Sequence, residues 1–67
     1  MGEINFVIKT PGNMVLVFDE QGEQVPEYQG RYEDVKKKII RDAPPGAIFG
    51  HRLNSRGETY LRLRETW

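Results

Sequence analysis

The chain has 67 residues, of which 37% are hydrophobic and 30% are charged, and it contains no cysteine. A chain of this length and composition is typical of one globular domain, here residues 1–67, rather than of a disordered tail. Ten acidic residues balance ten basic ones, which excludes a net charge that attracts nucleic acid or an anionic membrane from a distance. The lack of cysteine excludes disulfides, thiolate catalysis and cysteine-ligated zinc, and it is compatible with the expected location in the cytoplasm.

Two strands joined by a turn are predicted near the start of the chain. Residues 4–9 (INFVIK) alternate in the manner of a strand, and residues 14–18 (MVLVF) form an apolar run that sterically favours a strand. The sequence TPGN between them is typical of a turn, because proline presets the first corner and glycine tolerates positive φ at the second. Since both faces of residues 14–18 are apolar, we expect one face to cover the core and the other to be buried too or to be an adhesive surface.

A second turn follows at residues 19–22 (DEQG), where the aspartate comes first and the glycine fourth. This pattern allows a short strand at residues 23–25. Pro26 limits that strand to the edge of a sheet, because proline lacks the N–H that a central strand donates.

The segment 30–46 carries the clearest helical pattern in the chain. Apolar side chains recur at steps of three and four residues at Tyr32, Val35, Ile39 and Ala43. Two consecutive prolines follow, and they cannot continue the hydrogen-bond ladder, so we expect the helix to stop near Asp42. A helix of this length is not stable alone, so its apolar side must lie on a sheet.

Two further strands are predicted after the helix. Residues 47–53 (AIFGHRL) have Gly50 in their middle, which indicates a bulge or a close backbone approach. The turn NSRG at residues 54–57 again has its polar residue first and its glycine fourth, and residues 58–66 then alternate cleanly as a last strand.

This order predicts the α+β class, ββ(β)αββ, with a four- to five-stranded, mainly antiparallel or mixed sheet and one helix packed on one face. In the leading topology the first and last strands are central and their hairpin partners lie outside. If residues 23–25 do not pair, the outline resembles a β-grasp roll. If they do pair, the sheet has five strands. The resemblance is one of architecture and implies no function.

No motif indicates an enzyme, so we expect no catalytic residues, no metal site and no cofactor. His51 is the only histidine and lacks the second histidine or cysteine that a metal site would use, so we interpret it as a partly covered or solvent-facing strand residue. The carboxylates around Asp19 do not have the spacing of a calcium loop, and no glycine pattern forms a phosphate cradle. No apolar stretch is long enough to span a membrane, and we expect no membrane partner.

The sheet face turned away from the helix is the predicted site of function. Alternation suggests that Ile4, Phe6, Ile8, Leu61 and Leu63 face the helix. The opposite face then presents a candidate interaction surface composed of Lys9, Arg52, Tyr60, Arg62 and Arg64. Trp67 is expected to fold back over one of the two faces.

We therefore expect a protein-interaction or self-associating module that uses the open sheet face or an edge strand, with a protein partner or a second copy as its ligand. The alternative is the binding of single-stranded RNA or DNA, since bases stack on tyrosine and arginine side chains.

Overall fold

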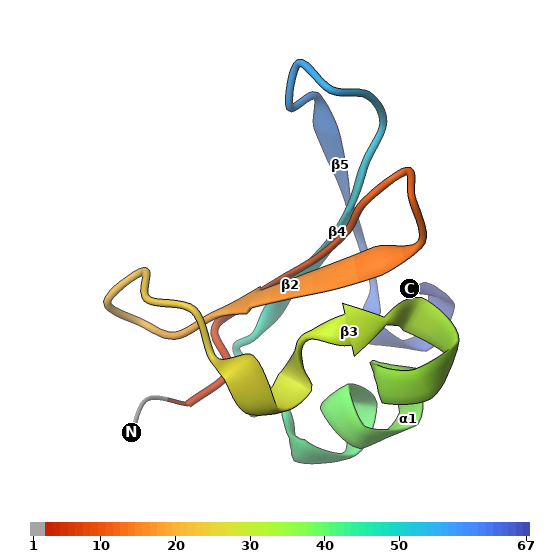
Figure 1. Cartoon of the computed structure of the whole chain (residues 1–67). Helices are drawn as coiled ribbons and strands as arrows, with labels where there is room; N and C mark the ends of the chain where they lie inside the picture. Colours follow the sequence, from red (N-terminus) through yellow and green to blue (C-terminus); the bar gives the residue numbers. More distant parts are fainter. Residues whose placement is uncertain (1–2) are drawn as a thin grey trace.

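The computed structural model describes residues 3–67, so Met1 and Gly2 lie outside the description. Figure 1 shows a twisted sheet with one helix against one of its faces. The strands are β1 (Phe6–Lys9), β2 (Met14–Phe18), β3 (Gly30–Arg31), β4 (Ile48–Arg52) and β5 (Thr59–Arg62). The helix is α1 (Tyr32–Asp42), and two short 3₁₀ turns are η1 (Pro26–Tyr28) and η2 (Arg64–Thr66). The predicted α+β class, with a mixed five-stranded sheet and one helix, is confirmed, and the sheet is open.

The order of the strands is β3-β2-β1-β4-β5, with β1 and β4 parallel and the other neighbours antiparallel. The expectation that the last strand is central is therefore wrong, because β5 lies at an edge and β4 lies beside β1. The helix crosses over the sheet and delivers the strand that directly follows it to the side of β1, which makes that pair parallel. The next hairpin then has room only on the outside, where it places β5.

The fifth strand is not the one expected at residues 23–25. That segment contributes one isolated bridge, Gln24 to Phe18, with two hydrogen bonds: the Val25 N–H donates to the Val17 carbonyl and the Asp19 N–H to the Glu23 carbonyl. The chain then turns through η1 at Pro26 and pairs with β2 only at Gly30 and Arg31, just before the helix. The proline ends the pairing because it has no N–H to donate.

The helix has the extent that the sequence predicts. It ends at Asp42, and Ala43, the residue before the two prolines, is extended with φ −69° and ψ 133°. Val35 and Ile39 are buried on its inner side, where they join the core formed with Val7, Val17 and Phe49. Acids in the first turn and Arg41 in the last turn suit the helix dipole.

The faces of β1 and β5 are opposite to those expected. Val7 is fully buried between Val17 and Phe49 on the helix side, whereas Phe6 and Ile8 point to the other side of the sheet. Of the residues expected under the helix, Ile4 does belong to the core, but Leu61 and Leu63 are 64% and 71% exposed. Since β1 is apolar on both faces, alternation alone does not decide which face is inside. The valines of β2 and Phe49 of β4 decide it.

Trp67 folds back over the helix side of the sheet, so the C-terminal segment leaves the other side bare. Its ring is 1% exposed and makes edge-on contacts with Tyr32 and Phe49 at centroid distances of 5.2 and 5.1 Å. The indole N–H donates to the carbonyl of Gly50 at 2.9 Å. A side chain at Gly50 would crowd Ile8 and the backbone of β5, which confirms the close approach that the sequence indicates.

Arg64 closes the exposed end of the helix. Its guanidinium donates to the carbonyls of Ile40, Ala43 and Pro44 at 2.6–2.9 Å and lies over the ring of Phe49. The last carbonyls of a helix have no partners within the helix, and a cation at this end is favoured by the dipole. The fork geometry of arginine allows one side chain to serve all three acceptors.

Replacing Arg64 with alanine is expected to destabilise the fold by about 2–3 kcal/mol, because three carbonyls lose a charged donor. Lysine at this position is expected to restore only part of the lost stability, since a single ammonium group cannot donate to all three carbonyls with the planar, forked geometry of a guanidinium. Urea denaturation followed by tryptophan fluorescence measures both variants. Arg56→Ala, an exposed turn residue, serves as the control and should change stability by less than about 0.5 kcal/mol. Equal stabilities for the Arg64 and Arg56 variants would contradict the capping role.

Candidate functional site

The structure does not bring the five residues of the predicted interaction surface together on one open face. Lys9, Tyr60 and Arg62 lie on the same side of the sheet as the helix, on the strands that extend beyond it. Arg52 points to the opposite side, and Arg64 is held at the end of the helix. The expected grouping on the face away from the helix is therefore wrong. In β1 and β5, the side chains expected on that face lie on the helix side, and those expected under the helix lie on the other side.

A row of polar and aromatic side chains crosses β1, β4 and β5 on the helix side. Lys9 is paired with His51, and His51 with Tyr60. The rings of His51 and Tyr60 are stacked at 5.6 Å, and the guanidinium of Arg62 lies 4.8 Å from the centre of the tyrosine ring. His51 Nε2 lies 3.2 Å from the backbone oxygen of Trp67, so the half-buried histidine has a structural partner.

The face away from the helix is apolar, and we call it the open face. It consists of Phe6, Ile8, Met14, Leu16, Phe18, Ile48, Leu61 and Leu63. Its centre is a cross-strand set in which Phe6 is paired with both Phe18 and Ile48, and the two phenylalanine rings lie 6.4 Å apart. The members of the open face differ in exposure: Ile8 is only 3% exposed and Phe6, Leu16 and Phe18 are half-buried, whereas Met14, Ile48, Leu61 and Leu63 are exposed. Sequence reasoning missed these residues as a group, although the two-faced apolar run of β2 was a signal of them.

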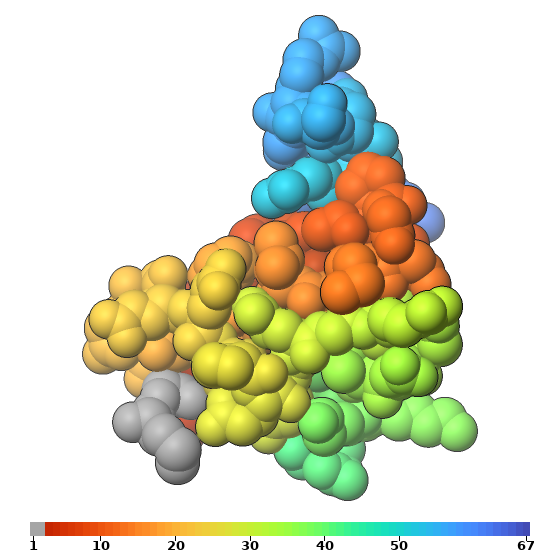
Figure 2. Space-filling view, viewed as in Figure 1, coloured from red at the N-terminus to blue at the C-terminus, as the bar shows by residue number. Residues whose placement is uncertain are grey.

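The hairpin of β4 and β5 extends the open face beyond the body of the molecule. In Figure 2 its turn forms a lobe at the top of the view, separate from the lobe made by the turn after β2 at the left. All four residues of β5 are exposed, and β5 pairs only with β4. The free edge and the apolar face therefore meet at Leu61.

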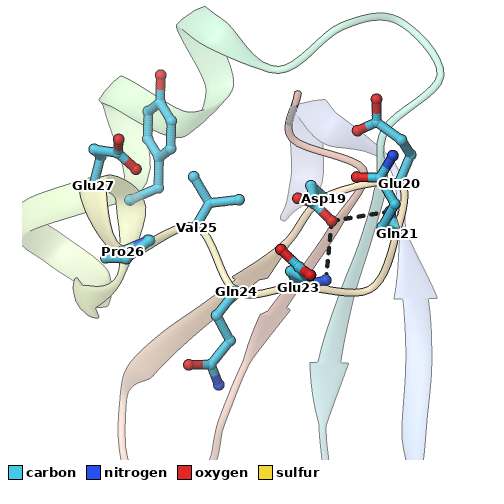
Figure 3. A pocket seen from close by; sticks show the side chains of 9 residues that line it. Asp19, Glu20, Gln21, Glu23, Gln24, Val25, Pro26 and Glu27 are labelled. Atoms are coloured by element: carbon cyan, nitrogen blue, oxygen red, sulfur yellow. Dashed lines mark hydrogen bonds between the residues drawn. The ribbon is translucent and has the colours of Figure 1, made fainter. Parts of the chain in front are cut away.

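The turn after β2 surrounds a shallow hollow of about 500 Å³ that is rich in carboxylates (Figure 3). Asp19 is 7% exposed, and its Oδ1 accepts the backbone N–H groups of Gln21 and Glu23, both at 2.9 Å. This bonding accounts for the buried aspartate as the residue that shapes the turn. Among residues 3–67, no group of three metal-ligating side chains comes together.

A hydrogen bond links η1 to the end of the helix. The hydroxyl of Tyr28 donates to Asp42 at 2.7 Å, and Arg41 donates twice to the same carboxylate. The guanidinium of Arg41, and after it the hydroxyl of Tyr28, lower the pKa of Asp42 from 3.8 to about 2. The same bond raises the pKa of Tyr28. Because the folded pKa of Asp42 is depressed, its contribution to stability is present above pH 3.8 and is lost as the pH falls through about 2.

Tyr28→Phe is expected to raise the pKa of Asp42, because one of its two hydrogen-bond donors is lost. The pKa should still remain below its usual value, since Arg41 is retained. A carboxyl-carbon NMR titration measures it directly. Tyr60→Phe is the matched control and should leave the Asp42 titration unchanged. A Tyr28→Phe protein with an unshifted Asp42 would show that the hydroxyl plays no part.

No protein-family model matches this chain, and neither a curated protein nor a solved structure matches it. In the described residues, no helix has the length and apolar character needed to span a membrane.

Proposed function

We propose that this protein is a self-associating interaction module whose open face binds the open face of a second copy. The observation that supports the proposal is the apolar open face, on which Met14, Ile48, Leu61 and Leu63 are 44–71% exposed. Isolated exposed leucines are common, but a contiguous apolar face across neighbouring strands is typical of an interface. The proposal assigns the protein no catalytic activity or cofactor, and its lack of cysteine suits the cytoplasm.

The size of the open face suits a weak, reversible dimer. Strands about 4.8 Å apart that rise about 3.3 Å per residue give four strands of about five residues a plan area of about 300 Å². Two such faces with uneven side chains bury roughly 1,000 Å², which is near the lower limit of a specific interface. A dissociation constant in the micromolar range is therefore expected.

A second copy is an occupant that fits this face physically. Two apolar sheet faces pack about 10 Å apart with their side chains interdigitated, as in a β-sandwich, and the copy supplies a face of the same extent. A chain of this length also buries only about 60% of the surface of its unfolded state, a smaller share than larger domains bury, so the added contact stabilises the fold. At neutral net charge, the copies do not repel one another as a whole.

Leu61→Asp is expected to weaken self-association at least about tenfold, because the contact would bury an unpaired carboxylate. Sedimentation velocity at increasing protein concentration measures the effect. Leu53 provides a matched control on the same hairpin: it is 55% exposed, but it follows Arg52 and so lies on the other side of the sheet. Leu53→Asp should associate as the wild type does. A wild-type chain that remains monomeric at high micromolar concentration would refute the proposal.

Single-stranded nucleic-acid binding is a second candidate, and it is supported by the row of Lys9, His51 and Tyr60 with the guanidinium of Arg62 over the tyrosine ring. Lys36 also lies near this row, with its ammonium 5.0 Å from the centre of the Tyr32 ring. Arginine and aromatic side chains offer stacking partners to unpaired bases, and the lysines attract phosphates. The neutral net charge of the molecule argues for weak binding.

For this candidate, binding of a fluorescent single-stranded oligonucleotide is expected at low salt and should fall steeply as salt is added. The double variant Tyr60→Ala with Arg62→Ala should abolish it, because both stacking groups are removed. Lys37→Ala, which removes one positive charge from the exposed helix surface, should reduce it only slightly. The candidate is rejected if the wild type shows no anisotropy change at low salt.

A further inference from the structure

The charges of this neutral chain are segregated between two lobes. Between Thr10 and Gly30 the sequence has four acidic residues and no lysine or arginine. We call residues 19–27 the acidic lobe; its carboxylates are Asp19, Glu20, Glu23 and Glu27. In residues 51–62 basic residues outnumber acidic ones, with three arginines and one glutamate. We call this segment the basic hairpin. A neutral molecule with this distribution has a marked charge asymmetry.

The two lobes lie at opposite ends of the sheet. Strand β2 is antiparallel to β1, and β4 is parallel to β1, so β2 and β4 run in opposite directions. The acidic lobe begins where β2 ends, and the turn of the basic hairpin begins where β4 ends. The open face lies between them, and the two lobes are separate in Figure 2. Any partner that covers the open face is therefore exposed to negative charge at one end and positive charge at the other.

Within the described part of the chain, the arginines of the hairpin form no ion pair with an acidic side chain. The ion pairs among residues 3–67 are Arg31 with Glu33 and Arg41 with Asp42. Arg52 lies on the open-face side of β4, and its Nε is shielded from solvent without an acceptor. A shielded guanidinium N–H without an acceptor is unfavourable in the monomer. Arg52 therefore lies at the edge of the apolar open face and has no acidic partner among the described residues.

We propose that the second copy lies on the open face with its strands reversed, related by a two-fold axis that is between the sheets and perpendicular to the strands. This inference rests on the proposed function, and it specifies the orientation of the dimer. Each basic hairpin then lies at the same end of the dimer as the acidic lobe of the other copy, so the favourable juxtaposition occurs twice. With the axis along the strands, arginines would face arginines and carboxylates would face carboxylates. Complementary potentials favour the reversed arrangement and select against the other.

The test uses reversal of charge at two positions of each lobe, of which Arg52 is half-buried and the other three are exposed. The hairpin variant carries Arg52→Glu and Arg56→Glu, and the lobe variant carries Glu20→Lys and Glu23→Lys. Asp19 is left intact because it shapes its turn. In the reversed dimer, each variant alone turns attraction into repulsion at both ends. We expect each dissociation constant to rise about tenfold or more at low ionic strength, with a smaller effect at high salt.

An equimolar mixture of the two variants is expected to form a heterodimer about as tight as the wild-type dimer, because both of its ends are attractive again. One chain that carries all four substitutions should likewise recover self-association. The control for altered net charge is Lys37→Glu with Arg41→Glu on the outer surface of the helix. It changes the net charge as the hairpin variant does, and it should change the dissociation constant much less.

The outcomes separate this inference from the proposed function. A wild type that does not self-associate overturns both. Suppose that the wild type dimerises and that Leu61→Asp weakens the dimer, but the hairpin and lobe variants do not. The proposed function then stands, and the reversed orientation is overturned. The reversed orientation is also overturned if the hairpin and lobe variants each dimerise more weakly than the wild type but their mixture does not recover wild-type affinity. Circular dichroism confirms that each variant is folded.

The absence of cysteine allows a direct check of orientation. Ser55→Cys lies in the turn of the basic hairpin, and Gln21→Cys lies in the acidic lobe; both positions are exposed. With a flexible bismaleimide linker, a mixture of the two proteins should give mainly the mixed cross-linked product. Cross-linking of Ser55→Cys to itself as the main product would indicate copies with their strands aligned and would overturn the inference.

Discussion

One short helix covers one face of a five-stranded sheet, and most features of this protein depend on that constraint. The helix has 11 residues, and its buried side chains meet the valines of β1 and β2 together with Phe49. Trp67 and Arg64 complete this layer, the first by filling the space beside the helix and the second by satisfying its last carbonyls. The contacts of the helix, Trp67 and Arg64 thus lie on the same side, and on the opposite side Met14, Ile48, Leu61 and Leu63 are exposed.

The parallel pairing of β1 and β4 determines where the uncovered surface extends. It brings Ile48 beside Phe6 and places the β4–β5 hairpin at the outer edge of the sheet, where the helix no longer reaches. The two sides of this hairpin consequently differ in chemistry. Its helix side carries the histidine, tyrosine and arginine stack, and its other side continues the apolar surface through Leu61. The two functional proposals follow from these two sides.

The helix, the turns that end at Gly22 and Gly57, and the fold class were accessible from the sequence, because periodicity, prolines and turn residues act locally. In the turn after β1 the positive φ expected at Gly12 is instead at Asn13, with φ 67°. The strand order was not accessible, since it depends on where the crossover places β4. The phase of β1 was also beyond local reasoning: Phe6 and Val7 are both apolar, and tertiary contacts with Val17 and Phe49 decide between them. The expected grouping of the candidate residues on one face was wrong for the same reason. Arg64 could be assigned to a face by alternation, but its role at the helix end depends on contacts with residues more than 20 positions away.

The enclosed indole of Trp67 has a practical consequence. It is the only tryptophan, and it contacts the helix through Tyr32 and the sheet through Phe49 and the carbonyl of Gly50. Its emission therefore reports whether the two layers are in contact, independently of events on the remote side of the sheet. A blue-shifted spectrum that persists on dilution would mark a folded monomer, so layer separation and subunit dissociation can be followed as distinct processes in one optical experiment.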